Sequence, residues 1–89
     1  MIARSVRVTG RIQGVFFRSW TAEQARALGV AGGVRNTPGG SVEGHLEGEE
    51  ASVQELIELL HQGPPAARVE HVDVDDSQPE GAANFEVRH

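Results

Sequence analysis

The chain has 89 residues, 8 basic and 13 acidic side chains, a net charge of −5 and no cysteine. This length supports one small domain over residues 1–89. The acidic balance argues against a surface that grips nucleic acid, and the lack of cysteine excludes disulfides, thiolate catalysis and cysteine-bound metals. No apolar run approaches membrane-spanning length and no signal peptide is recognisable, so we expect a cytoplasmic protein without a membrane partner.

The first third of the chain predicts a strand, a loop and a helix. Apolar and polar residues alternate over 3–9, which is typical of a half-buried strand, and a loop follows at 10–17. Apolar positions recur at helical spacing over 18–28, and Gly29 stands where a left-handed helix cap is common.

A hairpin is predicted next. Residues 30–36 and 41–47 have the pattern of strands, and the turn between them spans 37–40. Pro38 in the second turn position and Gly39 in the third favour a type II turn.

The second helix has the clearest pattern in the chain. It begins near two glutamates, Glu49 and Glu50, and ends before Gly63, which two prolines follow. Strands are predicted at 68–75 and 84–88, with a loop between them. The apolar positions of the helix are spaced i, i+3, i+4 and i+7: Val53, Leu56, Ile57 and Leu60.

The order of elements is therefore βαββαβ with a short final strand. Helices that alternate with hairpins predict an α+β fold, a ferredoxin-like α/β sandwich. Its sheet is expected to be mostly antiparallel, with both helices on one face.

The stretch GRIQGVFFR, residues 10–18, is the most informative part of the chain. Gly10 and Gly14 let the backbone curl so that successive amides point at one oxyanion, and a helix start adds unpaired N–H groups. Arg18 supplies a full positive charge. We therefore predict a phosphate site here.

Asn36 is predicted to face the same pocket. The strand alternation that turns Val34 toward the helices turns Asn36 the same way. Its amide can orient a water molecule but is far too weak a base to deprotonate it. Such a site needs a substrate with a good leaving group, and a mixed carboxylic-phosphoric anhydride has one.

Each of these residues also has a purely structural interpretation. Asn36 can instead initiate the turn, Arg18 can form a surface ion pair, and Gln13 can merely brace the loop. Phe16 and Phe17 are interpreted as one core anchor and one partly exposed ring rather than as substrate contacts. The four histidines show no metal-ligand spacing, so we expect no metal site.

The loop at 10–18 and the segment RNTPGGSVEG at 35–44 together resemble the acylphosphatase family. Its signatures are a G-x-V-Q-G-V-x-F-R loop and a later G-x-V-x-N-x-x-x-G-x-V-E hairpin. The segment GPPAARVEHVDV and the alternating last strand extend the resemblance over essentially the whole chain.

The resemblance implies a small cytosolic ferredoxin-like enzyme that hydrolyses acyl phosphates to a carboxylate and inorganic phosphate, without metal or cofactor. It implies that Arg18 is the catalytic arginine and Asn36 the water-orienting asparagine. The proton acceptor is then the substrate's own phosphate. The phosphate-binding amides fall on Gln13, Gly14, Val15, Phe16, Phe17 and Arg18.

Two positions depart from the family pattern. Gly33 stands where tryptophan is common, and Gly39 where aspartate or asparagine usually precedes the turn glycine. We expect looser packing near Asn36 and an altered turn, and therefore a changed rate rather than a lost activity.

The expected partners are a small acyl phosphate as substrate and inorganic phosphate as product and inhibitor, bound by a monomer. The alternative function is a non-enzymatic ferredoxin-like module that binds phosphate or another small ligand in a regulatory role. RNA binding is disfavoured, because three phenylalanines, one tryptophan and a negative charge do not make an RNA-binding sheet face.

Overall fold

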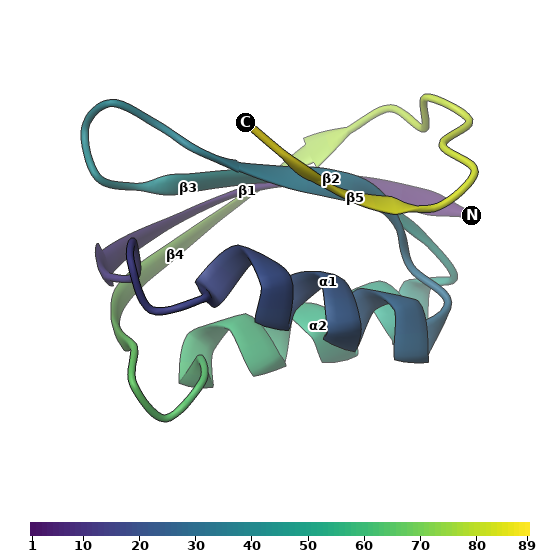
Figure 1. Ribbon diagram of the computed structural model, residues 1–89. Helices are drawn as coiled ribbons and strands as arrows, with labels where there is room; N and C mark the ends of the chain where they lie inside the picture. Colours follow the sequence, from purple (N-terminus) through teal and green to yellow (C-terminus); the bar gives the residue numbers. More distant parts are fainter.

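In the computed structural model, which describes residues 1–89, a five-stranded sheet carries two helices on one face (Figure 1). The expected βαββαβ order with a short last strand is confirmed, as is the ferredoxin-like α+β fold. The elements are β1 (Ile2–Arg11), α1 (Phe17–Leu28), β2 (Ala31–Asn36), β3 (Val42–Gly48), α2 (Glu50–Gln62), β4 (Arg68–Ser77) and β5 (Phe85–Arg88).

The strand order determines where the functional segments meet. The sheet has the order β4-β1-β3-β2-β5, and every neighbouring pair is antiparallel except β2 and β5. Strands β1, β2 and β5 therefore run in the same direction. Their carboxyl ends lie at one end of the sheet, where the loop after β1 leads into α1 (Figure 1).

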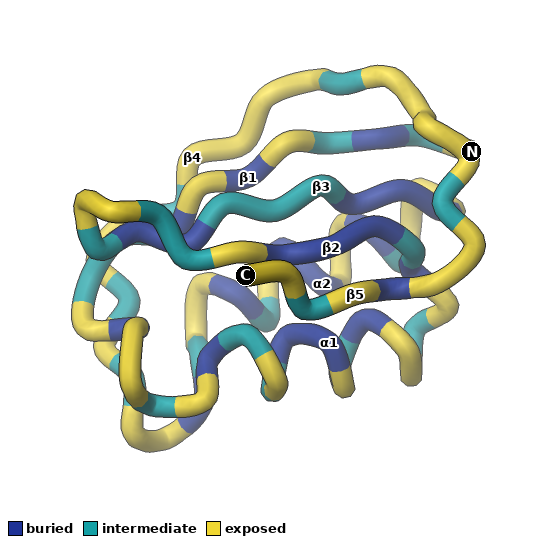
Figure 2. Tube along the Cα trace, turned by 45° about the horizontal axis from the view of Figure 1, so that its top comes forward, coloured by how far each residue is buried: buried dark blue, intermediate teal, exposed yellow.

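The apolar core lies between the sheet and the helices. Figure 2 shows buried stretches on the three central strands and on one side of each helix, whereas the edge strand β4 is largely exposed. All four predicted apolar positions of α2 are buried, and Gly29 ends α1 in the predicted left-handed conformation, with φ 72°. Neither helix is long and apolar enough to cross a membrane.

Gly10 belongs to β1, so the prediction of a loop that begins at this residue was wrong. The pairing of β1 with β4 shifts register between Thr9 and Gly10, where φ of Gly10 is 136°. A side chain at this bulge would collide with the carbonyl of Arg68. Glycine is therefore required here for strand pairing rather than for a phosphate cradle.

The turn between β2 and β3 is not the predicted type II turn. That turn requires a positive φ at Gly39, but the positive φ, 92°, is at Gly40. The N–H of Gly40 donates to the carbonyl of Thr37 at 3.2 Å, which is typical of a type I turn followed by a left-handed glycine. A Cβ at Gly39 would meet nothing within 4 Å, so a side chain is tolerated there.

A buried carboxylate fastens the connection between β4 and β5 to the sheet. Glu47 of β3 is only 1% exposed, and it accepts hydrogen bonds from the backbone N–H groups of Glu80 at 2.6 Å and Ala82 at 2.5 Å. Nε2 of His45 lies 2.8 Å from the same carboxylate. The bond from Glu80, followed by the one with His45, holds the pKa of Glu47 below its usual value despite burial.

Ionised Glu47 therefore stabilises the fold. Because the folded-state pKa is lowered, this stabilisation is fully present above the unfolded value of 4.5 and is lost as the pH falls through the folded pKa. We expect Glu47→Gln, which has one acceptor oxygen and no charge, to lower the free energy of unfolding by about 2 kcal/mol at neutral pH. Urea denaturation of both proteins from about pH 7 down to about pH 3 measures this. A stability difference that does not shrink in acid would contradict it.

Candidate active site

The loop between β1 and α1 has a backbone that alternates in handedness. Gly14 and Phe16 have positive φ, 78° and 59°, whereas φ of Val15 between them is not positive. Such alternation turns successive N–H groups into one concavity and is typical of an anion-binding nest. None of the N–H groups of residues 13–19 donates a hydrogen bond within the protein. The loop thus presents a run of unpaired backbone donors.

The start of α1 extends this run of donors. Phe16 is the N-cap, no side chain caps the helix, and its first turn holds no acidic residue. The first N–H groups of a helix carry a partial positive charge and lack intrahelical acceptors. Phe17 anchors the start in the core, because it is 1% exposed and its ring lies 5.7 Å from that of Trp20. With Phe16 84% exposed, the predicted division into one core ring and one exposed ring is confirmed.

Gln13 connects the loop to the β2–β3 hairpin. Its Nε2 donates to the backbone carbonyls of Thr37 and Ser41, each at 3.0 Å. This bracing role was one interpretation of the residue, and the hydrogen bonds support it. Thr37 also holds the turn, with its Oγ1 2.6 Å from Oγ of Ser41. The Asn36 side chain forms no hydrogen bond in the turn, so its interpretation as a turn initiator was wrong.

A pocket of about 230 Å³ opens where the loop, α1 and the end of β2 meet. It brings Arg18 and Asn36 together, as the strand alternation predicted. Of the predicted phosphate-binding residues, Gln13 and Val15 do not line it. Ser19 was not among the predicted site residues, although its place in the first turn of the helix indicated it. The lining residues are Ile12, Gly14, Phe16, Phe17, Arg18, Ser19 and Asn36.

Arg18 is held from the far end of the chain. Its Nη1 donates to the backbone carbonyl of Arg88 at 2.7 Å and lies 3.5 Å from Nδ1 of His89. No carboxylate lies within ion-pair distance of Arg18, so its interpretation as part of a surface ion pair was wrong. Nη2 and Nε make no hydrogen bond to the protein. The guanidinium is therefore fixed on one side and has free donors on the other.

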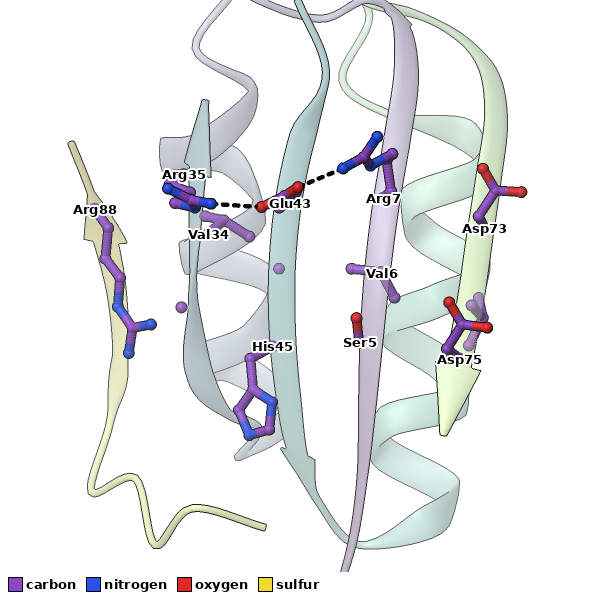
Figure 3. A pocket seen from close by; sticks show the side chains of 13 residues that line it. Ser5, Val6, Arg7, Val34, Arg35, Glu43, His45, Asp73, Asp75 and Arg88 are labelled. Carbon is purple, nitrogen blue, oxygen red and sulfur yellow. Dashed lines mark hydrogen bonds and ion pairs between the residues drawn. The ribbon is translucent and has the colours of Figure 1, made fainter. Parts of the chain in front are cut away.

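A larger hollow, about 720 Å³, lies on the helix-free face of the sheet (Figure 3). Arg7 and Arg35 both bind Glu43 there, at 2.5 and 2.8 Å, and these bonds lower the pKa of Glu43, with that from Arg35 contributing most. These charges are paired with one another, and no helix start faces them. We therefore locate the candidate active site in the smaller pocket beside α1.

Gly33 lies on the same helix-free face. A Cβ at this position would come within 2.7 Å of Nε of Arg88. Side chains alternate between the two faces along a strand, and an odd number of positions separates Gly33 from Asn36 in β2. Asn36 therefore faces the opposite side of the sheet. The expectation that Gly33 loosens packing near Asn36 was therefore wrong.

A family model for acylphosphatase matches residues 4–87. The chain belongs to the acylphosphatase family. It is 55% identical over 84 residues to the acylphosphatase of Rubrobacter xylanophilus, covering 93% of this chain and 76% of that protein. It is 54% identical over 82 residues to the acylphosphatase of Gloeobacter violaceus, covering 92% and 88%. The crystal structure of acylphosphatase from Bacillus subtilis matches with a TM-score of 0.97 and 33% identity over 100% of both chains.

The enzyme is therefore an acylphosphatase, a hydrolase that acts on the anhydride bond of acyl phosphates and releases inorganic phosphate. The family, the fold and the enzyme class predicted from the sequence are confirmed. This result overturns the non-enzymatic alternative.

Proposed function

We propose that the backbone amides of residues 13–18 together with Arg18 hold the phosphoryl group, and that Asn36 orients the attacking water. The observation that carries this proposal is the pocket itself. Arg18, whose guanidinium is fixed on one side, Asn36 and several residues with unpaired backbone amides all line one small cavity. Amide donors and a guanidinium are the groups best suited to the three phosphoryl oxygens.

The proposed reaction requires little more than a correctly positioned water molecule and positive charge near the phosphoryl oxygens. A water oriented by Asn36 attacks phosphorus, the bond from phosphorus to the acyl oxygen breaks, and the carboxylate leaves with the electron pair. The water's proton passes to a phosphoryl oxygen, which yields inorganic phosphate. No Asp, Glu or His lines the pocket. A carboxylate leaving group needs no protonation, so amides and one arginine are sufficient for an activated anhydride.

We further propose that residues 1–89 form one domain that acts as a cytoplasmic monomer. Support for the monomer comes from the pocket, since the β1–α1 loop, α1 and β2 of a single chain supply all of its lining. Sedimentation equilibrium of the purified enzyme tests the oligomeric state, and a stable dimer would contradict the proposal.

The proposal is tested by phosphate release from benzoyl phosphate in the presence of excess chelator. We expect full activity under these conditions, and competitive inhibition by inorganic phosphate because the loop recognises the phosphoryl group. Activity that is lost in chelator and restored by a divalent cation would overturn it.

A glycine substitution tests the nest separately. Gly14 has φ 78° and a Cβ there would meet nothing within 4 Å, so valine would act through backbone strain alone. We expect Gly14→Val to lose inhibition by phosphate and to lower kcat/KM more than tenfold, while the free energy of unfolding falls by about 1–3 kcal/mol.

The matched control for this variant is Gly39→Val. Gly39 does not have a positive φ and also has open space around it, so phosphate inhibition should persist. A Gly14→Val enzyme that binds phosphate with unchanged affinity would show that the loop is not the cradle.

A further inference from the structure

Phenylalanine is energetically unfavourable at position 16 for two separate reasons. It is the one residue other than glycine with positive φ, 59°, a conformation that favours glycine or asparagine. The residue is also 84% exposed, so its side chain gains almost nothing from burial. Neither the backbone nor the core accounts for phenylalanine here. The neighbouring Phe17 already supplies the core anchor.

Phe16 lies at the pocket that the acyl phosphate is proposed to enter. It lines the pocket that Arg18 and Asn36 border, and its exposure places it at the rim. An acyl phosphate has two ends, and once its phosphoryl group occupies the nest its acyl group projects outward across this rim. The hydrogen-bond donors of the nest are backbone N–H groups. The side chain at position 16 is therefore not needed for phosphate binding and can contact the acyl group.

We propose that the Phe16 ring contacts the acyl group and makes the enzyme selective for acyl phosphates that carry an aromatic or other bulky apolar acyl group. This inference rests on the proposed function of the pocket. A ring that stacks on an aromatic acyl group strengthens binding roughly three- to tenfold, whereas a methyl group offers too little surface for such a contact. Acetyl phosphate therefore gains least from Phe16.

The test compares benzoyl phosphate with acetyl phosphate as substrates of the wild-type enzyme, Phe16→Asn and Phe16→Tyr. Asparagine tolerates the left-handed backbone but removes the ring, and tyrosine keeps the ring. We expect the ratio of kcat/KM for benzoyl phosphate to that for acetyl phosphate to fall roughly three- to tenfold in Phe16→Asn, mainly through KM, and to persist in Phe16→Tyr. Val74→Ala, at an exposed apolar residue of β4, is the control.

Each other outcome overturns the inference. An unchanged ratio in Phe16→Asn means that the ring does not contact the acyl group. An equal loss with both substrates, accompanied by weaker inhibition by inorganic phosphate, means that Phe16 only shapes the loop. If the wild-type enzyme hydrolysed neither substrate, the proposed function would fail as well. If it hydrolysed both and only the ratio disagreed, the role of Phe16 alone would fail.

Discussion

Replacing Arg18 with alanine is expected to raise KM for benzoyl phosphate and to lower kcat by at least about 10²- to 10³-fold. Both parameters change because the proposed contact of the guanidinium with the phosphoryl oxygens exists in the ground state and in the transition state. The hydrogen bond from Arg18 to the carbonyl of Arg88 is lost too, but a single such bond costs about 1 kcal/mol and should leave the domain folded. Steady-state kinetics and circular dichroism measure the two effects.

Arg35→Ala is the matched control for this variant. Arg35 is an exposed arginine on the helix-free face, where it binds Glu43 away from the pocket. We expect its kcat and KM to stay at wild-type values. If folded Arg18→Ala kept both parameters within about threefold, equivalent to roughly 0.65 kcal/mol, Arg18 would have no part in catalysis.

Replacing Asn36 with alanine is expected to lower kcat by about 10²-fold while KM and phosphate inhibition stay nearly intact. Asn36 is proposed to contact the attacking water and not the phosphoryl group. Its loss should therefore slow the reaction without weakening substrate binding. The side chain makes no hydrogen bond within the protein, and Thr37 holds the turn, so stability should change little.

The control for Asn36→Ala is Asn84→Ala, at an exposed asparagine that precedes β5 far from the pocket. Its kinetics should match the wild type. A folded Asn36→Ala enzyme with kcat within about threefold of wild type would remove the water-orienting role. A large rise in KM would instead place Asn36 among the phosphate contacts.

Much of this structure could be predicted because the relevant information is local. The spacing of apolar residues determines both helices, and strand alternation correctly placed Asn36 on the side of the sheet that faces α1. The sequence also predicted that one of Phe16 and Phe17 lies in the core and the other is exposed, although it did not determine which. Each of these inferences depends on neighbours in sequence, whose relative directions the secondary structure alone determines.

The features that escaped prediction depend on segments far apart in the chain. Gly10 looked like a loop glycine, and only its pairing with β4 shows that it forms a bulge. Arg18 is held by the backbone carbonyl of Arg88. Every residue has such a carbonyl, so the residue type at position 88 does not indicate this hydrogen bond. The odd spacing of Gly33 from Asn36 in β2 already places the two residues on opposite faces, but the contact that a Gly33 side chain would make with Arg88 of β5 was hidden. The sign of φ at Phe16 was equally hidden, since phenylalanine rarely adopts that conformation.

The location of the phosphate site is the central claim, and a titration with inorganic phosphate followed by two-dimensional ¹H–¹⁵N NMR tests it most directly. We predict that the saturating chemical-shift changes are concentrated on the amides of residues 13–19, with the side chain of Arg18 responding at the same midpoint. The larger hollow on the helix-free face contains the arginines Arg7, Arg35 and Arg88 and is the rival anion site. Shifts centred on that face, with the amides of residues 13–19 unmoved, would contradict the account.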